Sequence, residues 1–159
     1  MTAWTDEKLI DGVNLRLVAS ENGIRRILLG WSGWPEGRRE PGHPLLVEAT
    51  SQLRAYFAGK LREFQLPLDL QGTDFQLRVW RQVLAIPYGE TRSYSGIARA
   101  IGAPNATRAV GAANGANPVA IVVPCHRVIG SGGKLVGYGG GLALKRRLLD
   151  LERAAPLFR

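Results

Sequence analysis

The chain has little cysteine, little histidine and no long apolar segment. Its 159 residues include one cysteine and two histidines, too few for an internal disulfide or for a structural zinc site of four Cys and His ligands. No apolar run approaches the roughly 20 residues that span a bilayer. The first residues lack a basic segment followed by an apolar core, so we expect no signal peptide. These absences favour a reducing compartment, and we expect a cytoplasmic protein without a metal site.

Acidic residues are also scarce. Thirteen Asp and Glu stand against 21 Lys and Arg, which gives a formal charge of +8 and a pI near 10.4. Such a surplus suits a polyanionic partner, because released counterions favour binding to phosphates. A basic protein without a nucleic-acid partner has the same balance, so charge alone leaves both readings open. The hydrophobic content of 45% is that of a globular protein.

Residues 1–71 are predicted to form a mixed α/β scaffold lobe. Residues 13–18 alternate apolar and polar side chains, residues 24–31 form a short apolar run, and the turn residues between them predict a β-hairpin. Residues 32–44 are interpreted as a loop, and residues 61–70 as another strand with a connection. A helix lies between these two segments, and its apolar positions are Leu46, Leu53, Tyr56 and Phe57.

The pattern changes at Gly72, and we place a lobe boundary between residues 1–71 and 72–159. Thr73 and Gln76 form a capping box before a helix. The apolar face of that helix is expected from Phe75, Val79, Val83 and Leu84. Near the end of the chain, residues 129–141 are predicted to form a glycine-rich hairpin. A last helix, residues 142–153, is expected to bury Leu144, Leu148 and Leu151.

Two short helices, residues 93–101 and 105–114, surround a tight turn and resemble a helix-turn-helix. Asn105 is expected to cap the second helix. Arg108 is the only large charged side chain on that helix; the small residues around it are Ala106, Ala109, Gly111, Ala112 and Ala113. A slim face allows close approach to a DNA groove, and one arginine can fill the gap left by an extruded base. The same face also suits tight packing against another helix.

Cys125 is the candidate nucleophile. It follows an apolar run and a proline, and the basic pair His126 and Arg127 comes directly after it. Nearby positive charge favours the thiolate, although a free cysteine is more often a small buried hydrophobe. If this segment is an extended strand, His126 points away from Cys125, and a bridging water would connect them. A histidine that acts as a base needs an acid to orient it, and the last helix offers Asp150 and Glu152.

Ordered segments from Gly72 onward carry a resemblance. They are Gly72-Thr73-Asp74-Phe75-Gln76, Val79-Trp80, Ile86-Pro87-Tyr88-Gly89-Glu90-Thr91, Ser93-Tyr94, Arg108-Ala109-Val110-Gly111, Asn117-Pro118-Val119, Pro124-Cys125-His126-Arg127-Val128, Gly137-Tyr138-Gly139-Gly140-Gly141-Leu142, and Leu148-Leu149 with Glu152. Together they resemble the O6-alkylguanine-DNA alkyltransferases (methylated-DNA–protein-cysteine methyltransferases). The first 70 residues fit that family only in length and general character.

The resemblance implies a role for each matching residue. Cys125 matches the alkyl acceptor, and His126 matches the base that deprotonates it through water. Glu152 matches the carboxylate that orients the histidine. Asn117 matches the residue that braces the active-site turn, and Tyr94 the tyrosine that protonates the leaving guanine.

It also implies residues that meet the DNA. Arg108 matches the arginine finger that enters the base stack. Other DNA contacts are expected from Ser93, Ala109, Ala112 and Arg127. The walls of the guanine pocket are expected from Val128, Tyr138 and Gly139.

The fold implied is α/β: a ribonuclease-H-like first lobe and a mostly helical lobe that holds the helix-turn-helix and the cysteine. The reaction implied is a single, irreversible transfer of an alkyl group from O6 of guanine, or O4 of thymine, to Cys125 after base flipping. It uses no cofactor and acts on the minor groove of double-stranded DNA; a monomer is expected in solution, with cooperative assembly on DNA left open. Two alternatives come from other classes: a cysteine hydrolase that turns over, and a non-catalytic helix-turn-helix protein.

Overall fold

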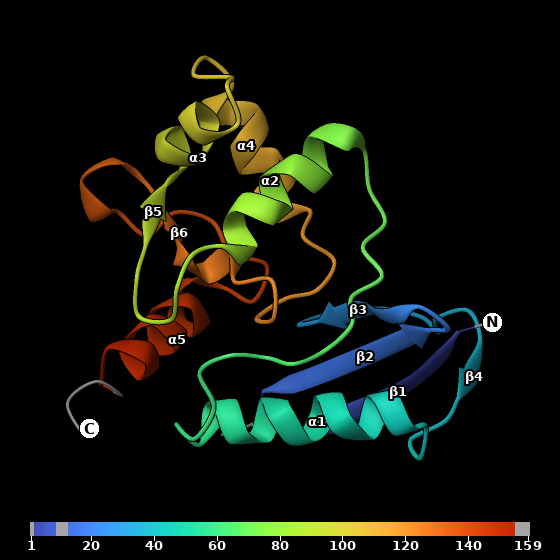
Figure 1. The fold of residues 1–159 in the computed structure, drawn as a ribbon. Helices are drawn as coiled ribbons and strands as arrows, with labels where there is room; N and C mark the ends of the chain where they lie inside the picture. The colour runs from blue at the N-terminus through green and yellow to red at the C-terminus, as the bar shows by residue number, and fades with distance from the viewer. Residues whose placement is uncertain (1, 9–12, 155–159) are drawn as a thin grey trace. The chain divides into compact units, whose positions relative to one another are not determined.

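The chain folds into two compact units, seen here in a computed structural model that describes residues 2–8 and 13–154 (Figure 1). The first unit is Met1–Gln71 with Pro118–Ala120, and the second is Gly72–Asn117 with Ile121–Arg159. The first mixes strands with a helix and the second is mostly helical, which confirms the expected fold class. Within the described residues, no helix is long and apolar enough to cross a membrane.

A four-stranded sheet in the order β3-β2-β1-β4 forms the first unit. The strands are β1 (Ala3–Lys8), β2 (Asn14–Ser20), β3 (Gly23–Leu28) and β4 (Arg38–Arg39). β2 and β3 pair antiparallel, which confirms the predicted hairpin. β1 and β4 are additional to the predicted strands. The strand predicted within residues 61–70 is wrong, because pairing there is reduced to one bridge between Leu68 and Ile24.

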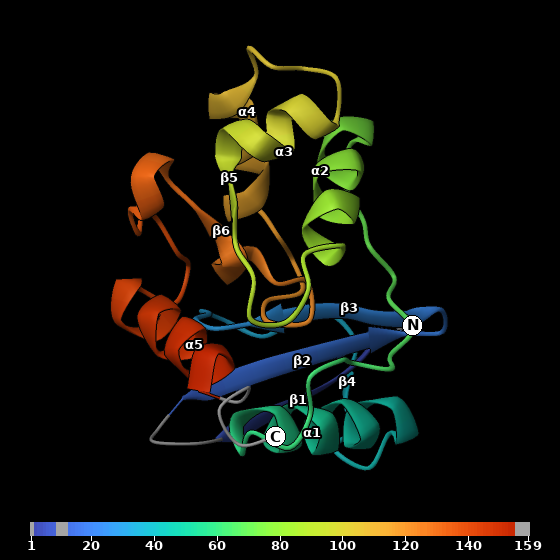
Figure 2. The ribbon, with the colours of Figure 1, turned by 60° about the vertical axis from the view of Figure 1, so that its left-hand side comes forward.

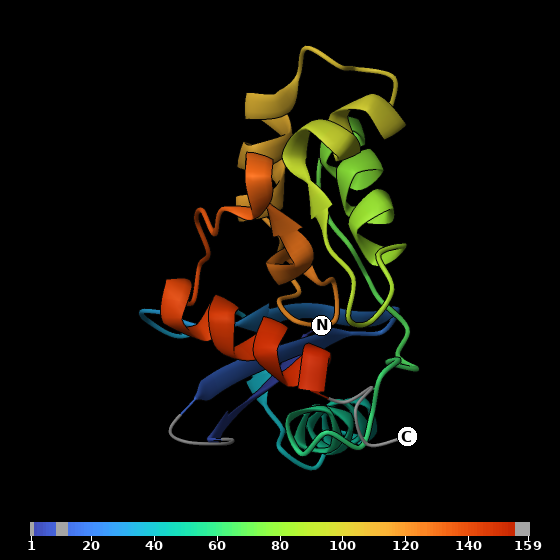
Figure 3. The ribbon, with the colours of Figure 1, turned by 90° about the vertical axis from the view of Figure 1, so that its left-hand side faces the viewer.

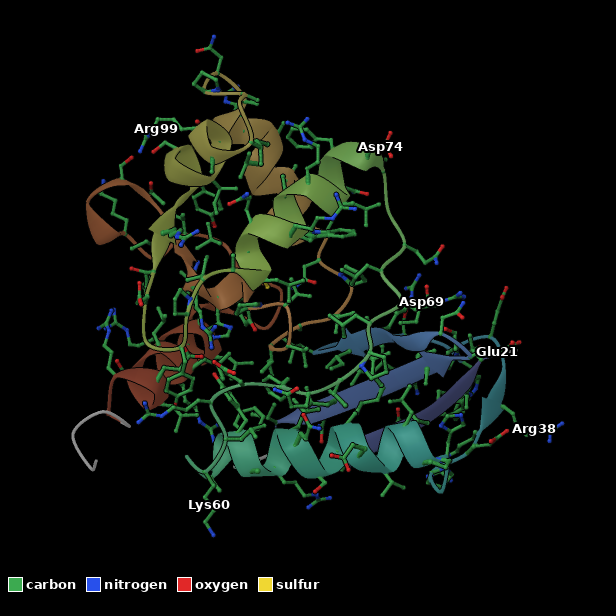
Figure 4. All side chains as sticks on the ribbon, in the orientation of Figure 1. Glu21, Arg38, Lys60, Asp69, Asp74 and Arg99 are labelled. Atoms are coloured by element: carbon green, nitrogen blue, oxygen red, sulfur yellow. The ribbon has the colours of Figure 1, made fainter. Side chains whose placement is uncertain are left out.

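The helix α1 (Pro44–Phe57) packs against β1, β2 and β3 and covers one face of the sheet (Figure 1). Pro44 stands at the first helical position, where the missing N–H has no intrahelical partner to lose. The four expected apolar positions are all buried: Leu46, Leu53, Tyr56 and Phe57. Figure 4 shows Lys60 just beyond one end of this helix and Arg38 on β4 at the other end of the unit. The first unit therefore has a core of its own.

Three helices of the second unit pack against one another, namely α2 (Asp74–Leu84), α3 (Tyr94–Ala100) and α4 (Thr107–Gly115) (Figure 2). The capping box is confirmed: Thr73 Oγ1 accepts from the Gln76 N–H at 3.1 Å, and Gln76 Oε1 accepts from the Thr73 N–H at 2.9 Å. On the buried face of α2, Trp80 takes the place expected for Leu84, which is 39% exposed. Trp80 Nε1 donates to Ala113 O at 2.8 Å and so ties α2 to α4.

α3 and α4 meet at the predicted tight turn, where Gly102 has a φ of 74°. That left-handed conformation favours glycine. Ser93 caps α3 by accepting the Gly96 N–H at 3.0 Å. The expected cap at Asn105 is wrong, because α4 begins after Ala106, whose side chain makes no cap hydrogen bond. The two helices form the helix-turn-helix that the sequence predicts.

A short 3₁₀ turn, η2 (Cys125–Arg127), follows the apolar run. The strand β6 (Val128–Ile129) leaves it and pairs parallel with β5 (Arg92–Ser93). The hairpin predicted for residues 129–141 is therefore wrong: the segment is a loop that contains one 3₁₀ turn, η3 (Ser131–Gly133).

The helix α5 (Leu142–Ala154) confirms the last predicted helix but buries a different face. Leu144 and Leu151 are only half-buried. The buried positions are Lys145, Leu148, Leu149 and Glu152. This face packs on η2 (Figure 3), so two charged side chains enter the core of the second unit.

Candidate active site and DNA-binding helix

Cys125 opens the 3₁₀ turn and is 7% exposed. Its N–H donates to Val123 O at 2.8 Å, and the Arg127 N–H donates to Pro124 O at 2.9 Å. The segment is therefore not an extended strand: successive side chains of a 3₁₀ turn differ in direction by about 120°, not 180°. Just before the turn, Ile121 has a φ of 73°, a conformation that is unusual for a β-branched residue and costs about 1–3 kcal/mol.

Two asparagines hold this turn. Asn117 Nδ2 donates to Val123 O at 2.8 Å, and Asn114 Nδ2 donates to Cys125 O at 3.3 Å. Asn114 is 5% exposed. A buried amide fixes a backbone carbonyl firmly, because an unpaired carbonyl in the core would cost about 1–3 kcal/mol. The carbonyls of the active-site turn are thus set by side chains from the end of α4 and the residues just after it.

The Cys125 thiol is protonated at neutral pH in the resting protein. Burial raises its pKa, and a hydrogen bond from Asn117 and the positive charge of Lys145 oppose that rise. Desolvation penalises the charged form of any acid, so a thiolate forms here only when a base removes the proton. The site therefore needs such a base close to Cys125.

His126 follows Cys125 and belongs to a buried charge network. Its Nε2 lies 2.6 Å from Glu152 Oε2, and neither side chain has exposed area. Burial raises the pKa of Glu152, but hydrogen bonds from His126 and Arg127 outweigh burial and lower the pKa to about 2. Burial lowers the pKa of His126 despite the neighbouring carboxylate. At neutral pH, Glu152 is therefore ionised and His126 is neutral.

That protonation state fixes the histidine tautomer. A carboxylate can only accept, so Nε2 of His126 carries the hydrogen and the lone pair resides on Nδ1. An imidazole oriented in this way can accept a proton, and Glu152 then stabilises the imidazolium. Of the two acids that the sequence offers, Glu152 occupies this position and Asp150 is exposed.

Arg127 is a correction to the expected DNA contacts. It is 6% exposed. Its Nε and Nη2 donate to Glu152 at 2.8 and 3.1 Å, and its Nη1 donates to Ile86 O at 2.7 Å. The side chain turns inward because the buried carboxylate of Glu152 needs a permanent countercharge. Its guanidinium is therefore engaged inside the second unit and is not presented to phosphates.

Lys145 is a buried part of the site that sequence reasoning missed. It has no exposed area, and its Nζ donates to three carbonyls, Val128 O at 2.7 Å, Val136 O at 3.0 Å and Gly137 O at 3.3 Å. It thereby joins the strand after the nucleophile to the loop before α5. The helical spacing could have indicated its burial. Lys145 precedes Leu148, Leu149 and Glu152 by three, four and seven residues and therefore lies on the same face of the helix.

Two tyrosines are electrostatically coupled to Cys125. Tyr94 Oη donates to Val136 O at 3.1 Å, and burial raises its pKa although a hydrogen bond from Asn114 opposes the rise. The Tyr138 ring lies edge-on to His126 with 6.5 Å between ring centroids. Burial raises the pKa of Tyr138 well above its ordinary value, and its Oη has no hydrogen-bond partner within the described residues. Both phenols are therefore protonated at neutral pH.

The other expected pocket residues differ in their exposure. Val128 is completely buried beside η2. Gly139 is exposed, and a Cβ built on it would meet no atom within 4 Å. The backbone at Gly139 therefore faces open space.

The outer face of α4 carries three of the residues that are expected to contact DNA. Arg108, Ala109 and Ala112 are all exposed, and Arg108 has no hydrogen-bond or ion-pair partner in the part of the chain that the structure describes. Packing inside the unit therefore does not account for Ala109 and Ala112, whereas Ala113, another of the small residues, is buried together with Val110. Arg99 points outward from α3 (Figure 4). Ser93 is committed to capping α3.

The formal charge is divided unequally between the two units. Residues 72–159 contain 12 of the 21 Lys and Arg but only 4 of the 13 Asp and Glu, which accounts for the whole net charge of +8. The first unit is formally neutral. The unit with the helix-turn-helix is thus the one suited to phosphates. Among the described residues, no three His, Cys, Asp or Glu side chains group as metal ligands.

Comparison with known proteins identifies the class. The DNA binding domain of 6-O-methylguanine DNA methyltransferase matches residues 74–154, and the ribonuclease-like domain of the same proteins matches residues 14–70. The chain belongs to the O6-methylguanine DNA methyltransferase family, as its motifs predict.

Within that family the chain is close to mycobacterial members. A methylated-DNA–protein-cysteine methyltransferase of Mycobacterium bovis is 68% identical over 106 residues, which are 67% of this chain and 64% of that protein. The crystal structure of the Mycobacterium tuberculosis O6-methylguanine methyltransferase superposes with a TM-score of 0.88 at 48% identity over 100% of both chains. The Mycobacterium tuberculosis protein in complex with DNA gives a TM-score of 0.85 at 51% identity, over 97% of this chain and 93% of that one.

Proposed function

We propose that this chain repairs O6-methylguanine in DNA directly, by moving the methyl group to Sγ of Cys125 in a reaction that each molecule performs once. The observation that carries the proposal is a buried cysteine next to the His126–Glu152 pair. The same unit contains α4, which exposes Arg108 among small side chains. Residues 72–159 form the alkyltransferase and DNA-binding lobe, and residues 1–71 serve as a scaffold lobe.

The first half of the reaction makes the nucleophile. His126 Nδ1 takes the Cys125 proton, through a bridging water, and Glu152 stabilises the imidazolium. The thiolate then attacks the methyl carbon in line: the S–C bond forms as the C–O6 bond breaks. A thioether has no hydrolytic exit, so Cys125 is consumed.

The second half concerns the leaving group. Guanine departs with the electron pair of the broken C–O bond, and proton donation from Tyr94 neutralises it. The raised pKa of Tyr94 keeps that proton in place until guanine accepts it. Asn117 braces the turn that carries Cys125. The walls of the base pocket are formed by Val128, Tyr138 and the open loop at Gly139.

DNA engagement uses the outer face of α4 in the minor groove. Ala109 and Ala112 allow close approach, Arg108 fills the stack when the damaged nucleotide is extruded, and Ser93 supports the start of α3. Flipping costs a few kcal/mol, and least where a lesion already weakens pairing. We propose a monomer in solution that works in the cytoplasm without a cofactor; cooperative assembly on DNA and transfer from O4 of thymine are extensions of the same proposal.

Intact mass spectrometry tests the proposal. The protein is incubated with double-stranded DNA that carries one O6-methylguanine, and we expect a gain of one methyl group, mapped to Cys125 and capped at one per molecule. Cys125→Ser serves as the control and gains nothing. Turnover of an ester or amide substrate in excess would support a cysteine hydrolase instead, and DNA binding without mass gain would support a non-catalytic DNA-binding protein.

A further inference from the structure

We infer that the first unit binds an unpaired base of single-stranded DNA, stacked on Trp34 in a hollow between β2, β3 and the loop that follows β3. The hollow has a volume of about 390 Å³, which is within the range of small-ligand sites. Its aromatic and charged lining consists of two indoles, three guanidinium groups and one carboxylate: Trp31, Trp34, Arg16, Arg25, Arg26 and Glu36. The site lies outside the alkyl-transfer machinery.

Cross-strand pairing builds one side of the hollow. β1 and β2 place Asp6 opposite Arg16 and Trp4 opposite Val18, and residues two apart on a strand share a face of the sheet. Arg16 is 3% exposed, and its Nε and Nη2 donate to Asp6 at 2.6 and 3.0 Å. Because both hydrogen bonds are charge-assisted, the buried guanidinium has a fixed position.

That guanidinium holds the tryptophans of the loop. Its Cζ lies 4.8 Å from the ring centroids of Trp4 and Trp31 and 5.8 Å from that of Trp34, within the range of cation–π attraction. Nη1 donates to Gly33 O at 2.9 Å, between the two loop indoles. Three of the four tryptophans in the chain thus surround one arginine, and their rings are oriented before any ligand binds.

Trp34 and Arg26 remain open to a ligand. Trp34 is 80% exposed, although its ring centroid lies 5.6 Å from that of Trp4, so packing covers little of the indole. Arg26 is exposed as well, and among the described residues it has no hydrogen-bond or ion-pair partner. An aromatic face stacks on any base, and a guanidinium pairs with a phosphate. An unpaired nucleotide in a strand offers both groups, whereas the neighbouring base pairs of a duplex cover the faces of a base.

Fluorine NMR of the full chain labelled with 5-fluorotryptophan tests the site, because each tryptophan gives its own resonance. The protein is titrated with a short oligothymidylate, and separately with thymidine 5′-monophosphate, a fully paired duplex and an oligoglutamate peptide. We expect the oligothymidylate to shift the Trp31 and Trp34 resonances. Trp80 donates to Ala113 O of α4 and therefore reports binding at the helix-turn-helix separately.

Two variants and their matched controls measure the contacts. Trp34→Ala should raise the dissociation constant, read from Trp31, at least about fivefold, the lower end of what the loss of one stacked base costs. Val47→Ala removes another exposed apolar side chain, on α1, and should leave the constant unchanged. Arg26→Ala should reduce the log–log salt slope by about 0.7, whereas Arg39→Ala, exposed on β4, should not change it.

Resonances of Trp31 and Trp34 that do not move with oligothymidylate would overturn the inference. Equally tight binding of the duplex would show that no base stacks there, and equally tight binding of the mononucleotide would show a site for free nucleotides. Tighter binding of oligoglutamate would show a site for acidic peptides, and each of these results overturns the inference. Methyl transfer to duplex DNA should keep its wild-type rate in Trp34→Ala and Arg26→Ala, so the titration stands or falls separately from the proposed function.

Discussion

His126 Nε2 and Glu152 Oε2 lie 2.6 Å apart with no exposed area on either side chain. The pair is not isolated, because Arg127 donates to the same carboxylate at 2.8 and 3.1 Å. Arg127 supplies the permanent countercharge, so His126 remains neutral and able to accept a proton. The two basic residues after Cys125 thus have different tasks, one as a proton acceptor and the other as a buried counterion.

Replacing Glu152 by Gln should therefore impair both reaction and fold. Without the carboxylate, the imidazolium loses its stabilisation, and we expect methyl transfer to slow by about 10²-fold or more. Arg127 is left without its buried counterion, which lowers the free energy of unfolding by about 3–5 kcal/mol. Single-turnover transfer and urea denaturation measure the two effects. Asp150→Asn, on the exposed face of the same helix, is the control, and an equal effect of both substitutions would contradict the assignment.

The same network predicts acid sensitivity. Both folded-state pKa values lie below the ordinary ones, about 2 against 4.5 for Glu152 and lowered from 6.5 for His126. The unfolded chain therefore binds protons first as the pH falls. We expect the free energy of unfolding to be highest at neutral pH. It should decrease as the pH falls below about 6.5, because His126 is then protonated only in the unfolded state. It should decrease again as the pH falls from about 4.5 toward 2.

Urea titrations at several pH values check this course. Asp69, whose pKa is lowered chiefly by a hydrogen bond from Ser20, contributes in the same acidic range. Glu152→Gln isolates the network, since that variant should lose the Glu152 part of the acid dependence and keep the part due to Asp69. Identical pH profiles for the variant and the wild type would show that Glu152 does not contribute.

Local signals in the sequence were sufficient for much of the fold. The Thr73–Gln76 capping box and the helix-turn-helix depend on neighbours within a few residues, and both are found. β1 was not predicted, because Ala3, Trp4 and Thr5 are all buried and the strand does not alternate between buried and exposed side chains. The hairpin predicted at residues 129–141 fails for a different reason: the partner of β6 is β5, which lies far back in the sequence.

The residues of the site divide in the same way, into those that the sequence indicates and those that depend on distant segments. The sequence points to Cys125, His126 and Glu152 as candidates, and the structure places the last two in contact. The sequence does not reveal that Arg127 turns inward or that Lys145 is buried. A charged side chain enters a core only where carboxylates or carbonyls from distant segments can pair with it. Those partners, Glu152 for Arg127 and Val136 for Lys145, come together only in the folded chain.

The two arginines at positions 108 and 127 should respond differently to salt. Arg108→Ala is expected to weaken productive binding of O6-methylguanine DNA, seen as slower transfer at limiting DNA and full transfer at saturating DNA. Any phosphate contact that it makes would reduce the log–log salt slope by about 0.9. Arg127→Met is expected to leave that slope unchanged while it lowers stability by about 3–5 kcal/mol. Fluorescence anisotropy with labelled duplex across a salt series measures the slopes. A reduced slope for Arg127→Met would show that Arg127 contacts a DNA phosphate.

Lys145→Met should loosen the loop that precedes α5. The substitution keeps most of the side-chain length but removes the donors to Val128 O, Val136 O and Gly137 O. A hydrogen bond to a charged group contributes about 1.5–3 kcal/mol, so stability should fall by at least that amount. Because Val136 O also accepts from Tyr94, a displaced loop should disturb the phenol and slow methyl transfer. Hydrogen exchange of residues 134–141 reports on the loop, with Arg146→Met on the exposed side of α5 as the control. If exchange in that loop stays at the wild-type rate, Lys145 is not what holds it.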